Sequence, residues 1–492
     1  LNDFEGRRET REVVQEAFWF PQAFRNGDFS SLLTPPLNAS GVPIRQPTVI
    51  FDPTTGEPFR NSAGQITNII PPSRINKAAQ DYVNRFLPLP MFTPTDPLDI
   101  NTRGSVPNII RNNQTMFRID HNLSSSDKVF VRYITDRGSW QNGDLNPNLT
   151  YFVTSVNTNL AAQWVKIINP TTVNEFRYGL NKSDNNTLNP RTNTGFDLDS
   201  LGLGQFRATS GRKFSDREIG LPATIIPGDR DGGNGFDFNT VHQFTNNLSM
   251  TRGSHTFKTG FEFRRLLLDR AAANVPRGSV ACCPGGYNLA GWLMGYFGDT
   301  QTGEGFPFTA PRQNRWSAYF LDDWKVTRKL SMNIGMRWDY FQVPLDSFGA
   351  WRSLRLDVLT RVPDGRSLPT VIPEVDTVNW PSYNKDNRYF MPRIGLAYRA
   401  TNKWVIRSGF GWFANAQQLN NFTILNIVPP VSGTIAYQIQ QDILPTFQYP
   451  YAGRNYTIQP SRLRPGFINS VGNIYGAGSG SVSSLPHTNP VP

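Results

Sequence analysis

Pairs of strand-like segments joined by very short polar turns are the feature that most constrains how this chain can fold. From Leu330 to Tyr340 every second residue is apolar, and the residues between are Ser, Asn, Gly, Arg and Asp. This period of two is typical of a β-strand with one apolar face and one polar face. A similar segment, Arg315 to Val326, precedes it and is separated from it only by Thr327 to Lys329. The two segments are therefore predicted to form a β-hairpin with a tight turn.

The same unit recurs along the chain. Further hairpins are predicted at 114–133, 161–180, 244–263 and 393–412, with turns at 124–127, 169–171, 251–254 and 401–402. These turns contain Ser, Thr, Asn or Asp, whose side chains bond to nearby backbone groups. With a further strand at the N-terminal end, about eleven strands are expected in all.

Long connections separate one hairpin from the next, at residues 15–112, 139–151, 185–238, 269–311 and 343–388. Most far exceed the roughly 2–6 residues usual inside compact domains. They are rich in Gly, Pro, Asn and Asp and are predicted to be irregular, except for a short amphipathic helical segment near 76–86. Short turns at one end of a sheet and long loops at the other are typical of bacterial outer-membrane barrels. The predicted fold class is therefore all-β, an antiparallel transmembrane outer-membrane β-barrel with long extracellular loops.

Composition agrees with this fold class. Aromatic residues make up 12% of the chain, which also has 41 Gly and 38 Pro, as expected of a loop-rich all-β protein. No apolar run is long enough to predict a transmembrane helix. The net charge is +11, but Lys and Arg form no dense run, so nucleic acid is not an expected partner. Membrane lipid, acidic groups of lipopolysaccharide and anionic solutes are the expected partners of the Arg side chains.

No residue pattern predicts an enzyme, a cofactor or a metal site. Asp322 and Asp323 are the only carboxylate pair that suggests catalysis, and adjacent strand residues point to opposite faces. The four histidines have no partner at metal-ligand spacing. Cys282 and Cys283 are adjacent in a predicted loop, where we expect a local clip or free thiols.

Charged residues in phase opposite the apolar stripe are predicted to face the lumen of the barrel. This set is Arg118, Asp120, Glu262, Arg264, Arg337, Asp339, Arg393 and Arg407. Their expected role is to form cross-strand ion pairs and hydrogen bonds along the polar wall, with direct solute contact as the alternative. Ligand contact is also considered for aromatic residues of the loops, although such residues equally anchor loop packing. These are Trp292, Tyr296, Trp351 and Trp380.

Several short motifs, taken in order, resemble one known family. They are Asp3 to Arg8, Phe24 to Ser30, Ile50 to Gly56, Ile69 to Ile75, Arg118 to Asn122, Asp322 to Val326 and Pro392 to Tyr398. Over about residues 1–415 the set resembles the barrel of TonB-dependent receptors of the Oar-like kind, which carry a carboxypeptidase-regulatory-like domain and a plug before the barrel. The resemblance implies a many-stranded barrel closed around the plug and energised by an inner-membrane TonB complex.

The chain departs from that family pattern at both ends. No initiating Met, signal peptide, plug or energy-coupling box is found, and residues 416–492 lack a terminal aromatic-ended strand. We therefore expect an internal fragment, with barrel sequence in 1–415 and a loop-rich continuation in 416–492. It would hold about half the strands of a barrel of roughly 22 strands. Because lipid cannot satisfy two open strand edges, the chain alone is not expected to insert stably.

The predicted function is that of an outer-membrane receptor or transporter for energy-coupled uptake of an extracellular solute, in the outer membrane of a Gram-negative-type bacterium. Two alternatives remain. A surface-display or adhesion protein could use the same barrel to present its loops. A secreted all-β carbohydrate-binding protein would have connections of similar length at both strand ends, which the asymmetry of this chain disfavours.

Overall fold

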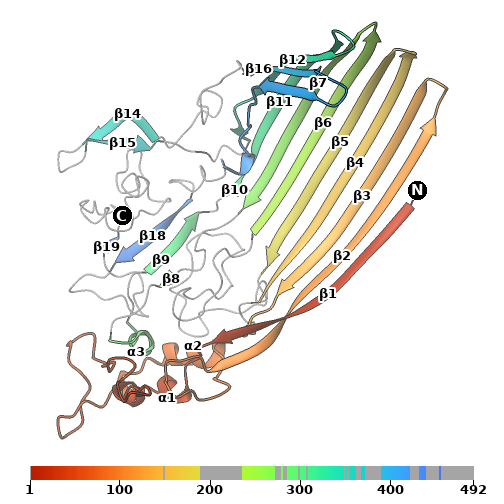
Figure 1. Cartoon of the computed structure of the whole chain (residues 1–492). Helices are drawn as coiled ribbons and strands as arrows, with labels where there is room; N and C mark the ends of the chain where they lie inside the picture. Colours follow the sequence, from red (N-terminus) through yellow and green to blue (C-terminus); the bar gives the residue numbers. More distant parts are fainter. Residues whose placement is uncertain are drawn as a thin grey trace.

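A computed structural model of the chain describes residues 2–147, 150–188, 235–271, 279–280, 285–296, 300–305, 308–347, 351, 354–361, 367–371, 389–421, 432–438 and 454–455. Its main feature is one large antiparallel sheet whose principal strands pair in the order of the chain (Figure 1). They are β1 (Asn2–Ala17), β2 (Thr102–Asn122), β3 (Asp127–Asn142), β4 (Tyr151–Asn169), β5 (Thr172–Leu188), β6 (Gly235–Arg252), β7 (His255–Ala271), β11 (Pro311–Lys325), β12 (Leu330–Phe341), β16 (Tyr389–Arg399) and β17 (Val405–Gly411). The all-β antiparallel fold and all five predicted hairpins are confirmed, and the principal strands number eleven as predicted, but the described residues also contain eight further short strands.

Smaller strands accompany this sheet. β10 (Phe308–Thr309) pairs with β7, and β13 (Leu345–Asp346) pairs with β11. Two further sheets contain β14 (Leu354–Arg361) with β15 (Ser367–Val371), and β8 (Ser279–Val280) with β9 (Thr300–Gly305), β18 (Ser432–Gln438) and β19 (Arg454–Asn455). Within the described residues the large sheet is open, with β1 at one edge and β17 at the other. The division of the chain at residue 415 stays a prediction, because most of 416–492 lies outside the described residues.

From β2 to β12, one face of the large sheet is mainly apolar over the half of the strands nearer the short turns. A continuous line of direct cross-strand partners there consists of Ile119, Val131, Ala162, Tyr178, Phe244, Phe263, Trp316 and Tyr340. Many of these side chains are exposed, as Ile119 is at 54%. On β12 the apolar positions extend from Leu330 to Tyr340, which matches the roughly 9–11 residues that a tilted strand needs to cross a bilayer.

The strands continue past this apolar band and are longer than the sequence pattern predicts. Thr115, Thr135 and Thr158 stand in one cross-strand row on the same face, beyond the last apolar row. β2 begins at Thr102 and β5 ends at Leu188, so the predicted loops 15–112 and 185–238 are shorter than expected. Both faces of a strand are solvated outside the membrane, so backbone pairing continues there without an apolar period.

The first long connection was expected to be irregular, and the structure corrects this. Residues 18–101 fold with residues 285–296 into a packed unit, here called the cap, which lies at the end of the sheet opposite the short turns (Figure 1). It contains α1 (Gln22–Arg25), η1 (Ser30–Leu33), η2 (Pro72–Arg74), α2 (Lys77–Phe86) and α3 (Asn288–Leu293). Its core is formed by Trp19, Phe20, Phe24, Phe29, Leu32, Ile50, Ile70, Ala79, Tyr82, Val83, Phe86, Leu87, Leu289, Ala290, Trp292, Leu293 and Met294.

The α2 helix confirms the amphipathic segment expected near 76–86. The Asn76 side chain accepts a hydrogen bond from Ala79 N at 3.2 Å, as an N-cap residue does. Tyr82, Val83 and Phe86 lie on the buried face of the helix. The helix is therefore held by burial of one face in the cap core rather than by its own length, which is too short for stability in water.

The cap is held together by contacts of α3 with the α2 region, and it is joined to the end of the sheet by Asn101. α3 follows β7 in the chain, yet Trp292 Nε1 donates to Ala79 O at 3.2 Å and Asn76 N donates to Leu293 O at 2.7 Å. At the base, buried Asn101 accepts from Trp19 N at 2.7 Å and donates to Trp19 O at 2.6 Å. The cap thus joins the loop after β1 to the loop after β7. No helix in the described part of the chain is long and apolar enough to cross a membrane.

Asn68 organises the centre of the cap. Its backbone has φ 54°, a left-handed conformation that Asn adopts more readily than most residues. Its Oδ1 accepts from Ile50 N at 2.9 Å and its Nδ2 donates to Thr48 O at 2.7 Å, while its carbonyl accepts from Phe29 N at 3.0 Å. One buried amide therefore satisfies backbone groups of two other segments, which would otherwise be buried without partners.

Candidate functional site

The strand register places all eight charged residues of the predicted set on one face of the sheet. Residues two apart on a strand share a face, and direct cross-strand partners do so as well. One continuous line of partners consists of Asp120, Phe130, Gln163, Arg177, Thr245, Glu262, Ser317, Asp339 and Tyr389. Arg393 lies four residues beyond Tyr389 on β16, and Arg407 pairs with Ala397 on the same face. That this polar face borders a lumen stays a prediction.

The ion pairs of this set lie along strands instead of across them. Arg118 contacts Asp120 at 2.6 Å, Arg264 contacts Glu262 at 2.7 Å and Arg337 contacts Asp339 at 2.9 Å. Side chains two residues apart project side by side from one strand, and the long Arg side chain spans that separation. Across strands, Glu262 Oε2 accepts a hydrogen bond from Gln243 Nε2 at 3.0 Å, and outside the set Lys258 Nζ lies 3.0 Å from Asp323 Oδ2.

The remaining two arginines of the set differ from these pairs. The Arg393 guanidinium lies over the Phe413 ring, with its carbon 4.7 Å from the ring centroid. Arg407 is exposed and makes no hydrogen bond or ion pair within the described part of the chain.

The ion pairs differ in burial, and this predicts different effects on stability. Asp339 is 6% exposed, so Asp339→Asn would leave the half-buried Arg337 without its partner and should cost about 1–3 kcal/mol. Asp120 is exposed in its pair with Arg118, so Asp120→Asn should leave the melting temperature unchanged. Thermal unfolding of both purified variants in detergent checks this. Equal melting temperatures for the two variants would show that burial does not govern these pairs.

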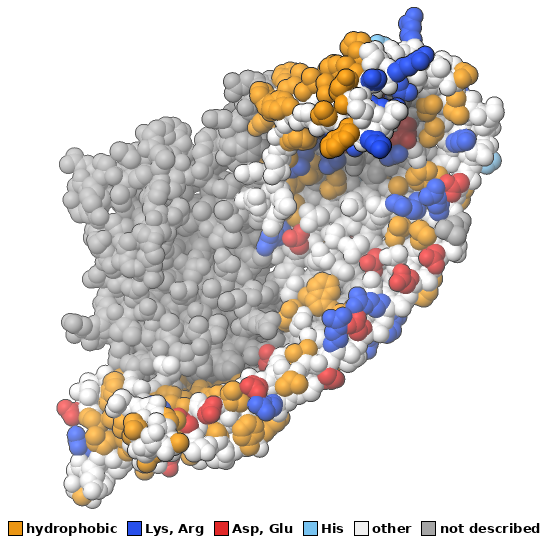
Figure 2. Space-filling model, viewed as in Figure 1, with side chains coloured by type: hydrophobic (Ala, Val, Ile, Leu, Met, Phe, Trp, Pro, Cys, Tyr) orange, Lys and Arg blue, Asp and Glu red, His pale blue; other side chains and the backbone are white. Residues whose placement is uncertain are grey.

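Arginines gather in one cross-strand row of the polar face, here called the arginine row. The row of direct partners is Arg118, Arg132, Ala161, Gly179, Gln243, Arg264 and Arg315. Asp120, Glu262 and Asp339 occupy the neighbouring row nearer the short turns. Acidic and basic side chains lie interspersed along the part of the sheet visible in Figure 2. On the polar face the arginine row therefore lies beside a row that contains three acidic side chains and Arg177.

Arg118 and Arg132 are directly opposite one another on β2 and β3. Like charges in that position repel unless other groups compensate them. Asp120 and the Phe130 ring, 4.6 Å from the guanidinium carbon, accompany Arg118. Arg132 has no ion pair within the described residues, and its Nη2 donates to Asn159 Oδ1 at 3.4 Å. Arg132 therefore contributes positive charge that no ion pair compensates within the described residues.

The cap contains a buried arginine that the sequence did not single out. Arg25 is 2% exposed, and its guanidinium donates to the carbonyl oxygens of Phe20 at 2.8 Å, Val83 at 3.2 Å and Leu87 at 3.0 Å, and to that of Pro88. Burial lowers the pKa of Arg25 to about 10, so the side chain stays charged at neutral pH. The positive charge lies at the carbonyl end of α2, where the helix dipole favours a cation.

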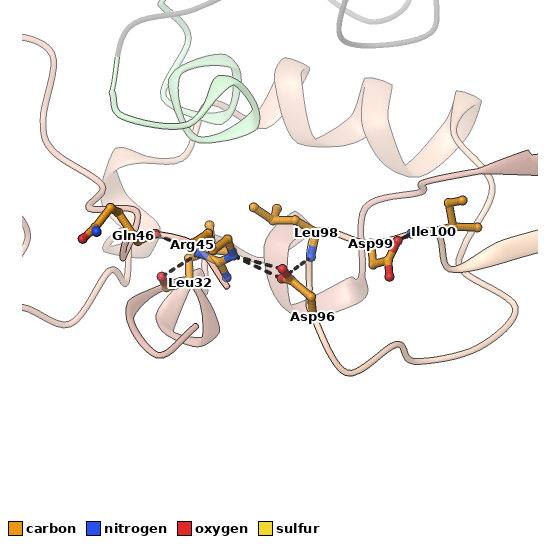
Figure 3. Close-up of polar contacts among 7 residues, drawn as sticks. All are labelled: Leu32, Arg45, Gln46, Asp96, Leu98, Asp99 and Ile100. Atoms are coloured by element: carbon orange, nitrogen blue, oxygen red, sulfur yellow. Dashed lines mark hydrogen bonds and ion pairs between the residues drawn. The ribbon is translucent and has the colours of Figure 1, made fainter. Parts of the chain in front are cut away.

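A second arginine ties the outer segments of the cap together. Arg45 Nε lies 3.2 Å from both carboxylate oxygens of Asp96, and Arg45 Nη1 donates to Leu32 O at 3.3 Å (Figure 3). Asp96 Oδ1 also accepts from Leu98 N at 3.0 Å. Arg45 and Asp96 are both mostly buried, so solvent and salt screen this pair less than a surface pair. Three stretches of the cap are therefore joined at one ion pair.

The structure buries two of the loop aromatics considered as ligand contacts. Trp292 lies in the cap core, and the Trp351 indole donates to Thr309 Oγ1 at 2.7 Å. Neither indole is accessible to a solute in this arrangement, because protein groups surround both and both serve loop packing. Tyr296 is partly buried against the cap core. Trp380, Cys282 and Cys283 lie outside the described residues.

Asp322 and Asp323 point to opposite faces of β11, as expected. Asp322 Oδ2 lies 2.8 Å from His255 Nδ1, whereas Asp323 bonds to Lys258 and to Asn333 on the polar face. The two carboxylates cannot converge on one substrate bond. In the part of the chain that the structure describes, no group of three or more His, Cys, Asp or Glu side chains is arranged to hold a metal ion.

Arg25, Asn68 and Asn101 are the residues that sequence reasoning missed. Their importance depends on backbone groups from other segments, which no local spacing reveals. The only signal is that Arg25 lies inside the motif from Phe24 to Ser30 in the first long connection.

Two proteins of known structure have a distant similarity to this chain. The outer membrane transporter YddB from Escherichia coli has 11% identity and a TM-score of 0.33, over 64% of this chain and 41% of that chain. The ferric-catecholate import receptor Fiu from E. coli K12, in its open form, has 7% identity and a TM-score of 0.23, over 73% of this chain and 58% of that chain. This chain thus spans less than two thirds of either protein. A comparison with curated proteins found no match.

The family comparison covers almost the whole sequence. A family model described as outer membrane beta barrel domain matches residues 2–483. The match includes every strand of the large sheet, with its short turns, its exposed apolar band and its charged opposite face. This chain belongs to the outer membrane beta barrel domain family and is located in the outer membrane.

Proposed function

We propose that this chain is the barrel portion of an outer-membrane receptor that takes up an extracellular solute, with energy supplied by an inner-membrane TonB complex. The observation that carries the proposal is the continuous polar face. Charged and amide side chains follow one another across β2 to β12 on the face opposite the apolar band. A wall of this kind offers successive polar contacts to a solute, as the lumens of membrane barrels do.

The position of the cap, at the end of the sheet opposite the short turns, also supports this proposal. The cap lies next to the strand ends that extend beyond the apolar band (Figure 1), so an extracellular solute would contact the cap before it reached the polar face. Its ion pairs and buried core hold it as one body, which suits a surface that captures a solute. The arginine row then lies deeper along the path, nearer the short turns.

Uptake can be tested in cells before the solute is identified. We expect cells that produce the protein to deplete at least one compound from a defined medium, measured by mass spectrometry, and a protonophore to abolish that depletion. Arg132→Gln with Arg315→Gln should lower the initial rate about fivefold or more, which corresponds to about 1 kcal/mol. Lys182→Gln is the matched control, since Lys182 pairs with Asp184 on the opposite face of β5.

Equal depletion by producing and non-producing cells would contradict uptake. Surface display would then be the better-supported function. One observation favours it as the second candidate function. The cap presents large exposed apolar side chains, including Leu37, Leu89 and Met91, which suit contact with another surface. Adhesion of producing cells to host or abiotic surfaces, lost on disruption of the cap, would support display.

A further inference from the structure

Three arginines cluster on the outer face of β1, β2 and β3, the face that carries the apolar band. Arg8 is the direct partner of Arg111, and Arg137 is the direct partner of Asn113, two residues along β2 from Arg111. The register places all three on the face of Phe117 and Tyr133, opposite the arginine row. We call these three residues the outward arginine cluster.

The cluster carries positive charge that the protein does not neutralise. Arg8 donates to Asn112 O at 2.8 Å and to Asn113 Oδ1 at 2.6 Å, which are uncharged acceptors. Arg111 and Arg137 are exposed and make no hydrogen bond or ion pair within the described residues. Directly opposed like charges destabilise a strand pair unless an anion lies between them.

The acidic groups nearest on this face are engaged elsewhere. Glu12 Oε2, four residues from Arg8, accepts from Ser105 Oγ at 2.7 Å. Asp184 on β5 pairs with Lys182 at 2.5 Å. The uncharged Phe4 ring and Asn113 amide lie against Gly6, the partner of Asn113, so no acidic side chain is supplied there. The cluster therefore offers an open, positively charged surface.

The position of the cluster along the membrane normal places it near the lipid headgroups. Phe117 and Tyr133 are exposed partners in the last apolar row, and Phe4 is exposed one row beyond. Arg137 lies four residues from Tyr133 and Arg111 six residues from Phe117, which is about 13–20 Å along a strand and about 9–14 Å along the normal of a membrane crossed at about 45°. Long Arg side chains can reach back toward the membrane from that height.

We propose that the outward arginine cluster binds the phosphate groups of a phosphorylated lipid in the outer leaflet. Guanidinium groups make paired, charge-assisted hydrogen bonds to phosphate oxygens. The acyl chains of the same lipid would lie on Phe117 and Tyr133, with the row of Phe4, Thr115 and Thr135 between the chains and the headgroup. This binding does not depend on solute uptake, because it uses the opposite face of the sheet.

Binding can be measured with purified full chain in detergent micelles. The probe is diphosphorylated lipid A, compared with the same lipid after phosphatase treatment and with inorganic phosphate as competitor. We expect the wild-type chain to bind the phosphorylated lipid at least about tenfold more tightly than the dephosphorylated one. The double variant Arg111→Gln, Arg137→Gln should lose that preference, while Arg111→Lys, Arg137→Lys should keep part of it because the charges remain.

Arg103→Gln is the matched control, since Arg103 lies on the same face of β2 but pairs with Glu16 at 2.5 Å. It should bind as the wild-type chain does. An unchanged preference in the double Gln variant would overturn the proposal, and so would an equal loss in Arg103→Gln. Full competition by millimolar inorganic phosphate would also overturn it, by showing a site for free anions instead of a lipid. Comparable heat-modified migration of all variants on a gel establishes that each one is folded.

Discussion

Replacing Arg25 by Met is expected to unfold the cap while the large sheet remains paired. The substitution removes the Arg25 donors from four carbonyl groups around the end of α2, of which Val83 O keeps its hydrogen bond from Leu87 N at 3.1 Å. A buried acceptor left without a donor costs about 1–3 kcal/mol, so the total should exceed about 3 kcal/mol. Hydrogen exchange read by mass spectrometry should show fast exchange across residues 18–101 and unchanged protection in β4 and β5.

Two further variants test whether the charge of Arg25 or its hydrogen bonds to the carbonyl groups protect the cap from exchange. Arg25→Lys keeps the charge but cannot supply the forked donors, so it should give an intermediate loss of protection. Arg60→Met is the matched control, since Arg60 is an exposed cap arginine whose Nη1 donates to Gly64 O at 2.7 Å. Wild-type exchange in Arg25→Met would show that the carbonyl contacts do not hold the cap.

Replacing Gly286 by Ala should release residues 285–296 from the cap. Gly286 has φ +85°, and a Cβ at that position would overlap the carbonyl oxygen of Val49. The neighbouring Gly285 O accepts from Phe51 N at 3.2 Å, so the two backbones lie against each other. Backbone strain of about 1–2 kcal/mol adds to an overlap that only separation of the segments can relieve. Hydrogen exchange in α3 and proteolysis near residue 286 should both accelerate.

Gly41→Ala is the control for the strain alone. Gly41 has φ +74°, close to that of Gly286, but no atom lies within 4 Å of the site where its Cβ would stand. Gly41→Ala should therefore cost only the backbone strain, and α3 should stay protected from hydrogen exchange. Similar exchange in the two variants would mean that contact with Val49 does not hold the segment, and that α3 is retained by the side-chain core alone.

Together these two variants test whether the cap acts as one body. Arg25 holds the end of α2, and Gly286 allows the segment from the β7–β11 connection to approach Val49 and Phe51. If the cap is one cooperative unit, each variant should loosen both α2 and α3. If it is two units, Arg25→Met should affect α2 alone and Gly286→Ala should affect α3 alone.

The sheet could be predicted from the sequence because its signal is local. On β12 the alternation from Leu330 to Tyr340 indicates which residues share a face of the strand. The short turn at 327–329 sets the register between β12 and β11. The same two signals recur in every hairpin. They were sufficient to place the eight charged residues on one face, because the period of a strand carries over to its neighbours through direct partners.

The ends of the strands could not be predicted in the same way. Outside the membrane no face has to be apolar, so β2 continues through Arg103 to Asn108 without an alternating pattern. What extends a strand there is backbone hydrogen bonding to β1 and β3, which depends on those neighbours being present.

By itself, the sequence determined the fold class, the hairpins and the two faces of the sheet, since each follows from a repeat of two residues and a short turn. Only the tertiary structure decided the cap. Its core residues Trp19, Phe24 and Phe29 follow no period, and Trp292 meets Ala79 from a segment more than two hundred residues away. The roles of Arg25 and Asn68 were decided there too, because each satisfies backbone groups that come together only when distant segments pack.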